Sequence, residues 1–280
     1  MNSSHLRIIP LKQDPSLVDV IRNLLEPAPV GELNTRKWPR FEFSGPGIEQ
    51  LLGQLLHLFP SHQFVAMNTQ SGKVVGCGLS VPFHWKRTLA DLPTGWDDVL
   101  ARGIRQAGDG LAPNDMSMLL MTVLPEEQER GIANQFLEAF RNIARAHGHG
   151  HLLGPVRPLL KMKYPQAAIQ EYFNWQNKEG KIFDPWLRFH HQAGGRYLAI
   201  APHSVTVEGT LKEWEEWTGL QFPVSGDYVV PSALSPVSID LTSDQGVYRQ
   251  PNVWVVHQID ELQQPLGTRE FPIKLPNVCH

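Results

Sequence analysis

The sequence has little or none of several features that define other classes of protein. Its 280 residues include two cysteines, Cys77 and Cys279, which cannot form a disulfide framework and do not have the spacing of a zinc site. No apolar run approaches the roughly 18 residues that a membrane span needs, and residues 1–13 lack the basic-then-apolar order of a secretion signal. We therefore expect a cytoplasmic protein without a membrane partner.

The sequence also has no excess of positive charge. Lys and Arg number 25 against 28 Asp and Glu, a formal net charge of -3. Because binding to a phosphate backbone normally uses a surplus of basic side chains, we expect no nucleic-acid partner. No G-x-S-x-G elbow and no Walker loop occurs, which argues against a serine hydrolase or an NTPase. Abundant instead are hydrophobic residues, at 41%, and eight tryptophans, five of them beyond residue 170.

The first hundred residues predict a mixed α/β fold. A strand at 5–11 is followed by a helix whose apolar positions start at Leu17 and which Asp14 or Ser16 can cap. A second helix is predicted at 47–58. A hairpin follows, with strands at 63–68 and 73–81 and Gly72 in the turn. Residues 84–114 are polar, with a helical patch at 96–104, and indicate an insertion over a sheet face.

Residues 116–153 are the most informative part. The apolar run 118–123 is typical of a strand buried on both faces. A helix with a clear apolar stripe then begins near Gly131 and stops at Gly148. His151-Leu-Leu is predicted to be the next strand, cut short by Gly154-Pro155. A strand, short loop and glycine-initiated helix leave unpaired backbone N–H groups at a helix N-terminus, which is an anion site.

The loop before this helix contains Gln128-x-x-Gly131-x-Ala133, which matches the pattern Q/R-x-x-G-x-G/A. With the order of elements around it, the sequence resembles the GNAT superfamily of acyl-CoA N-acyltransferases over about residues 5–155. The resemblance implies an α/β (α+β mixed sheet) fold with a C-terminal extension. We expect one domain, 1–280, in which 5–155 form the core with the acyl-CoA loop, and 156–280 complete the sheet and elaborate the acceptor side.

The resemblance also implies a co-substrate, acetyl-CoA or another acyl-CoA, and no metal. Small residues at Gly131 and Ala133 let a diphosphate approach the main chain without a Cβ clash. By resemblance, main-chain amides of the loop and first helical turn hold the pyrophosphate, and the backbone of the preceding strand pairs with the pantetheine arm. The residues are Gln128, Glu129, Arg130, Gly131, Ile132, Ala133 and Asn134 for the pyrophosphate, and Met121, Thr122 and Val123 for the pantetheine.

The loop is more acidic than the family pattern. Glu126, Glu127 and Glu129 accompany a single Arg130, and carboxylates repel a diphosphate. Either these side chains point to solvent, or the affinity for CoA is modest, or the donor differs from CoA.

The catalytic candidates are two histidines. In the family, a segment like L-Y-x-x-x-G carries a tyrosine near the thioester sulfur; the similar segment 184–195 has His190 at that position and His191 as the alternative. An imidazole is better suited than a phenol to act as a base toward an amine. The strand 116–123 has no carboxylate after Asp115, so the common base of the family is missing there.

Two further residues are candidates for the acceptor site. Arg157 can clamp a carboxylate, and Tyr164 follows it in the same basic loop, although a solvated loop is the alternative interpretation. The alternating histidines at 147–151 offer one ligand class on a glycine-rich turn, so zinc is not expected.

The C-terminal half predicts short strands at 196–207, 228–230 and 252–257 and a helix at 211–219. More than 50 of these residues exceed what the family fold needs. They can extend the sheet, cover the acceptor pocket or form a homodimer contact. Core packing is the simplest role for the tryptophans, and an aromatic lining for an acyl chain is the alternative.

The expected reaction is attack of a small-molecule amine on the acyl-CoA thioester, with most of the rate supplied by proximity. Two alternatives stay open. One is a GNAT-like module that binds acyl-CoA without turnover, and the other is an acyltransferase whose donor is a carrier protein or an aminoacyl-tRNA.

Overall fold

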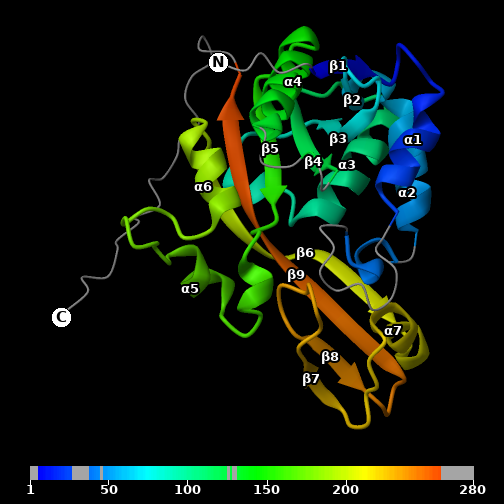
Figure 1. Ribbon diagram of the computed structural model, residues 1–280, viewed down its shortest axis with the longest axis vertical. Helices are drawn as coiled ribbons and strands as arrows, with labels where there is room; N and C mark the ends of the chain where they lie inside the picture. The colour runs from blue at the N-terminus through cyan, green and yellow to red at the C-terminus, as the bar shows by residue number, and fades with distance from the viewer. Residues whose placement is uncertain (1–5, 27–37, 45–46, 125–126, 128–130, 260–280) are drawn as a thin grey trace.

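The computed structural model describes the chain except for residues 1–5, 27–37, 45–46, 125–126, 128–130 and 260–280. Strands and helices alternate through the first part, and long strands dominate the last (Figure 1). The strands are β1 (Leu6–Pro10), β2 (Phe64–Asn68), β3 (Val74–Phe83), β4 (Asp115–Val123), β5 (His151–Val156), β6 (Arg196–Gly209), β7 (Gly226–Tyr228), β8 (Val237–Asp240) and β9 (Gln245–Gln258). The helices are α1 (Leu17–Leu24), α2 (Ile48–Leu58), α3 (Trp96–Gly108), α4 (Ile132–Ala146), α5 (Ile169–Phe173), α6 (Pro185–Gln192) and α7 (Leu211–Thr218), with a 3-10 turn, η1, at Arg40–Phe43.

The strands form one mixed sheet in the order β1-β2-β3-β4-β5-β9-β8-β7, with β6 also paired to β9. Every described pair is antiparallel except β4 and β5, which are parallel. The predicted mixed α/β fold is therefore confirmed.

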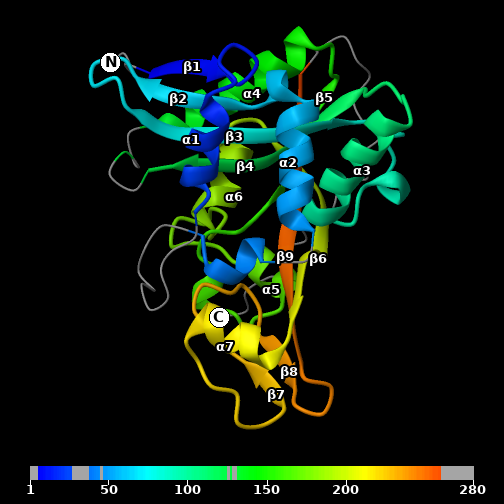
Figure 2. The same cartoon turned by 90° about the vertical axis from the view of Figure 1, so that its right-hand side faces the viewer.

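Helices cover both faces of the sheet. The helices α1, α2 and α3 lie on one face and α4 lies on the other (Figure 2). Buried side chains of α1, α2 and α3 pack with β3 and β4, whereas those of α4 pack with β2, β3 and β4. The α4 face has a close fit at β3, because Cβ atoms at Gly76 and Gly78 would lie 3.0 Å from the Phe136 ring and 2.7 Å from the Phe140 ring. The strand glycines thus make room for the aromatic stripe of α4.

The strand that begins at His151 is longer than the sequence indicates. The prediction that Gly154-Pro155 ends it is wrong, because β5 continues to Val156 and Pro155 lies opposite Trp254 of β9. Proline is tolerated here because β5 has no ladder with β4 beyond Leu153, and a strand paired on one side only can accept it.

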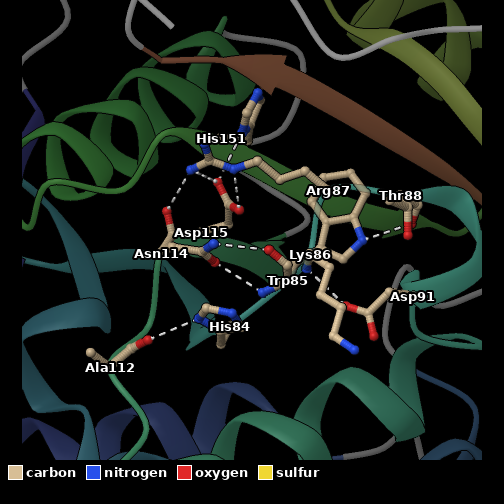
Figure 3. A network of polar contacts seen from close by, with 10 residues as sticks. All are labelled: His84, Trp85, Lys86, Arg87, Thr88, Asp91, Ala112, Asn114, Asp115 and His151. Atoms are coloured by element: carbon tan, nitrogen blue, oxygen red, sulfur yellow. Dashed lines mark hydrogen bonds and ion pairs between the residues drawn. The ribbon is translucent and has the colours of Figure 1, made fainter. Parts of the chain in front are cut away.

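A buried ion-pair network ties together the paired ends of β4 and β5 (Figure 3). Asp115, at the start of β4, accepts from Arg87 Nε at 3.1 Å and lies 2.9 Å from His151 Nδ1 at the start of β5. The Asp115 side chain is fully buried. The neighbouring Asn114 side chain accepts a hydrogen bond from the Trp85 amide and donates one to the Trp85 carbonyl. These contacts hold the two parallel strands together at this end.

The long strand β9 joins two parts of the sheet. Its residues Val253–Gln258 pair with β5, whereas Gln245–Tyr248 pair with β8, and β6 follows its other edge (Figure 1). The extra residues of the C-terminal half therefore extend the sheet, one of the three roles considered for them. Trp214 and Trp254 are core residues whose indole N–H groups donate to the Gly246 and Pro93 carbonyls.

The single-domain organisation stays a prediction, which the pairing of N- and C-terminal strands supports. Within the described part of the chain, no helix combines the length and apolar character that crossing a membrane requires.

Candidate active site

The central feature of the site is a fork between β4 and β5. Their ladder consists of Met116 opposite Leu152 and Ser117 opposite Leu153, and beyond these pairs the two strands run on without pairing to each other. Because the strands are parallel, both carboxyl ends lie on the open side of the fork. An extended ligand can reach the backbone of β4 there, between the α4 face and the face covered by α1 and α2.

A β-bulge in β4 lies just inside the fork. The register of β3 against β4 shifts at Leu119, since Leu79 faces Leu120 and Ser80 faces Met118. The Leu119 carbonyl accepts a hydrogen bond from the Trp96 indole at 2.7 Å. A bulge bends the strand that carries it, which is the physical reason for the divergence of β4 from β5.

The N-terminus of α4 lies after the open end of β4. Gly131 precedes the helix with φ of 72°, a conformation that favours glycine, and no atom of the described residues, its chain neighbours aside, lies within 4 Å of where its Cβ would be. No side chain among the described residues caps the helix. The first-turn amides of Ile132, Ala133 and Asn134 lie at this end, where the anion site is predicted. Gln128, Glu129 and Arg130, and Glu126 of the acidic set, lie outside the described residues.

The three residues expected to face pantetheine all lie on β4 beyond its ladder with β5. Met121 and Val123 flank the buried cluster under α4. Between them, Thr122 accepts a hydrogen bond on its hydroxyl from the Trp38 indole at 3.1 Å. Trp38 therefore links the β4 arm of the fork to the segment between α1 and α2.

On the other arm, Arg157 follows β5 directly and faces the same tryptophan. Its guanidinium carbon lies 5.9 Å from the centre of the Trp38 ring. Arg157 Nε contacts Glu42 Oε1 at 3.2 Å and Gln250 Oε1 at 3.0 Å, and Nη2 donates to the Ser232 carbonyl at 2.7 Å. The carboxylate that Arg157 holds in the structure is thus one from its own chain.

Two carboxyl groups on this side of the sheet were missed by sequence reasoning. Glu42, in η1, is 7% exposed, and Asp97 is the second residue of α3. Burial raises the pKa of Asp97 to about 6, opposed by the hydrogen bond from the Thr206 amide and assisted by the charge of Glu42. Neither residue stands in a recognisable motif. The polar residues Tyr248, Gln250 and Asn252 alternate along the buried strand β9, and this pattern in the sequence could have indicated a buried polar site.

His190 is buried at 2% exposure and takes part in a chain of polar contacts. Arg141 Nη2 lies 3.1 Å from His257 Nδ1, and His257 Nε2 lies 3.1 Å from His190 Nδ1. Because a guanidinium only donates, His257 carries its proton on Nε2 and donates it to His190, which then carries its own proton on Nε2. Burial, with His257 and Arg141 nearby, lowers the pKa of His190 to about 3, so the ring is neutral.

His190 is placed on the paired side of the fork, since its partner His257 lies opposite Leu152. His191 is exposed and stacks on Tyr197 at 6.0 Å between ring centres. Asp184 caps α6, Pro185 opens it and Gly194 follows it with φ of 82°.

Tyr164 belongs to a separate aromatic cluster. Its ring lies 5.0 to 6.2 Å from those of Tyr172, Trp175 and Phe183, and its carbonyl accepts from Lys161 Nζ at 2.8 Å. The structure does not join Tyr164 to the contacts of Arg157.

The alternating histidines divide between two environments. His149 Nε2 lies 3.0 Å from His62 Nε2, whereas His151 binds Asp115. Among the described residues, no group of three or more His, Cys, Asp or Glu side chains could hold a metal ion.

Comparison with known proteins finds a relative by sequence and solved structures with the same fold. No family model matches the chain. The arginine N-acetyltransferase avaD of Aspergillus versicolor is 34% identical over 269 residues, covering 86% of this chain and 91% of that protein.

Two solved structures share the fold. The loading GNATL domain of CurA from Lyngbya majuscula matches with a TM-score of 0.51 and 18% identity, over 91% of this chain and 96% of that one. The GphF GNAT-like decarboxylase in complex with isobutyryl-CoA matches with a TM-score of 0.52 and 17% identity, over 91% and 99%. Together with the forked sheet, the relative shows that this chain belongs to the GNAT superfamily and is an acyl-CoA-dependent N-acyltransferase.

Proposed function

We propose that the enzyme transfers an acetyl group from acetyl-CoA to an amine of a basic small molecule, with arginine as the first candidate. The proposal rests on the similarity of this chain to an arginine N-acetyltransferase, which extends over most of both chains. The carboxyl groups of Glu42 and Asp97 on the acceptor side of the fork suit a positively charged acceptor.

The residues at the fork fit acyl-CoA. The amides of Gly131 to Asn134 at the start of α4 suit its diphosphate, and the backbone of Met121 to Val123 suits its extended arm. We propose Gln128, Glu129 and Arg130 as further contacts of the diphosphate. Bound acyl-CoA supplies an activated thioester carbonyl. A backbone N–H of β4 polarises that carbonyl in the proposed reaction.

The protein's main task in the reaction is to position the amine and remove its proton. The amine nitrogen bonds to the carbonyl carbon, the carbon–sulfur bond breaks, and the thiolate leaves with the electron pair. The proton released by the amine goes to Asp97, directly or through water, because a carboxylate with a pKa of about 6 is mostly ionised at neutral pH and can accept it.

For His190 we propose a positioning role in place of the base that the sequence indicates. Its neutral ring links α6, β9 and α4 through the chain of contacts to Arg141. His191 is the alternative candidate for the catalytic histidine. Replacing each by Ala tests both, and unchanged thioester consumption in both variants would remove the histidines from the mechanism.

The direct test is to incubate the purified protein with acetyl-CoA and a panel of amines and to measure free thiol and acetylated product together. We expect arginine to release CoA and gain one acetyl group in equal amounts. Binding of acetyl-CoA without turnover of any amine would instead favour the sensor alternative, and acylation only from a carrier protein or aminoacyl-tRNA would favour the other.

Location and assembly are part of the proposal. We propose a cytoplasmic enzyme, supported by the free thiol of Cys77 in the core. We further propose that the chain is one domain and that any homodimer contact uses the C-terminal elaboration.

A further inference from the structure

The side chain of Glu42 lies at the mouth of the fork. Trp38 bonds Thr122 on β4 and faces Arg157 beyond β5, so it spans the two arms. Glu42 lies in η1, shortly after Trp38 in the chain, and contacts Arg157 Nε at 3.2 Å. The Glu42 carboxylate therefore lies next to residues that contact both arms of the fork.

A row of polar side chains on β9 fixes the position of Arg157 and, through it, that of Glu42. Tyr248 donates to Gln250 Oε1, Gln250 Nε2 donates to Asn252, and Asn252 donates to the Pro155 carbonyl at 3.0 Å. Gln250 Oε1 also accepts from Arg157 Nε at 3.0 Å. Arg157 is thus a positioning residue that holds one carboxylate oxygen of Glu42, Oε1, in place.

The second carboxylate oxygen, Glu42 Oε2, is buried and has no hydrogen-bond partner within the part of the chain that the structure describes. The Glu42 side chain is only 5% exposed. A buried carboxylate oxygen without a donor is costly and rare in folded proteins. The neighbouring polar row is satisfied, so Oε2 is the position at which an external N–H donor is needed.

The charge balance favours a cationic donor. Two carboxylates, Glu42 and Asp97, lie close enough for the charge of Glu42 to raise the pKa of Asp97, and among the described residues Arg157 is the basic side chain that contacts Glu42. The charge of Glu42 acts on Asp97 across this space. A guanidinium or ammonium group would supply both the missing N–H and the missing positive charge, through a charge-assisted hydrogen bond.

We propose that Glu42 determines acceptor specificity by binding a positively charged group of the acceptor, a guanidinium or an ammonium, that is separate from the amine being acylated. The inference rests on the proposed function and assigns a residue to its substrate selectivity.

The test compares arginine with citrulline, in which an uncharged urea replaces the guanidinium, as acceptors for the wild type and for Glu42→Gln. We expect the wild type to prefer arginine in kcat/KM by about tenfold to a hundredfold, the usual worth of a hydrogen bond to a charged group. In Glu42→Gln the preference should fall close to one, through a higher KM for arginine, while citrulline turnover is retained.

Three controls make the result specific. Glu42→Asp keeps the charge and should keep part of the preference. Glu171→Gln, an exposed glutamate on α5, should change nothing. Thermal melting and acetyl-CoA affinity of each variant check its folding, as does retained citrulline turnover.

An unchanged preference in Glu42→Gln, or an equal loss of activity with both acceptors, would overturn the inference. If the wild type acylates neither acceptor, the proposed function fails. Calorimetric titration of arginine and citrulline into the wild type and Glu42→Gln then tests whether Glu42 binds the positively charged group. Arginine binding that Glu42→Gln weakens would support its role, and binding that does not differ between the two proteins would overturn it.

Discussion

Asp97 is the side chain whose titration should shape the activity near neutral pH. Its pKa is raised to about 6 by burial, and a base must be unprotonated to accept a proton. We predict a rise in kcat/KM near pH 6 as Asp97 ionises, in addition to the rise that accompanies deprotonation of the acceptor amine. Asp97→Asn should remove this step and lower kcat/KM by roughly a hundredfold.

A pH–rate profile from about pH 5 to about pH 8 checks this prediction. Asp98→Asn is the matched control, because Asp98 lies on the same helical turn but bonds to Thr94 and Arg102 on the protein surface. If Asp97→Asn keeps the step near pH 6, another group is the proton acceptor.

The glycine at the anion site was visible in the sequence, whereas the acidic groups were not. Gly131 belongs to a local motif that needs a positive φ and an open main chain, and both are present. Glu42 and Asp97 acquire their burial from η1, α3, β6 and β9, which are far apart in the sequence. No local spacing records such a contact, so a motif search passes over them.

At the scale of elements, the cap of α6 carries more stability than an ordinary cap. Asp184 accepts from the amides of Trp186 and Leu187, and its other oxygen accepts from Leu160 N and the Tyr172 hydroxyl. Because Asp184 is 1% exposed, Asp184→Ala leaves buried donors without a partner. We predict a loss of about 2–4 kcal/mol in unfolding free energy.

Thr210→Ala provides the comparison. Thr210 caps α7 through a capping box on the surface, so its loss should cost only about 1 kcal/mol. Urea denaturation of both variants measures the difference. Equal destabilisation would show that the buried partners of Asp184 add nothing.

Both caps are local features, because a cap and its helix are neighbours in the chain. The fork is not a local feature. It depends on where the β4–β5 ladder ends and on the bulge at Leu119, which involve strands brought together only by folding. The same reason explains why the strand at His151 was predicted too short.

The whole molecule should lose stability in mild acid because it buries neutral histidines. Burial lowers the pKa of four of them: to about 3 for His62 and His190, and to about 4 for His149 and His257. Unfolded histidines titrate near 6.5, so below that pH the unfolded state binds more protons and stability falls as pH falls. The raised pKa of Asp97 has the opposite effect on the free energy of unfolding, but it is one group against the four histidines.

We predict a loss on the order of 2 kcal/mol per histidine by two pH units below 6.5. Urea midpoints at about pH 7.5 and about pH 4.5 measure it. His62→Gln should reduce the difference, and the exposed His57→Gln should not. Equal midpoints at both pH values would contradict the prediction.

We propose that acyl-CoA binds at the fork with its diphosphate on the start of α4. Gly131 and Gly148 flank the two ends of this helix, both with φ of 72° and with no atom of a described residue near the Cβ position. Alanine at either site should cost a similar 1–2 kcal/mol of stability. Only Gly131→Ala brings a methyl group to the anion site.

Calorimetric titration of CoA into the wild type and these two variants is the most direct test. We expect one site in the wild type, a Kd at least about tenfold weaker in Gly131→Ala, and an unchanged Kd in Gly148→Ala. No binding heat from the wild type at millimolar CoA, or equal weakening in both variants, would contradict the proposal.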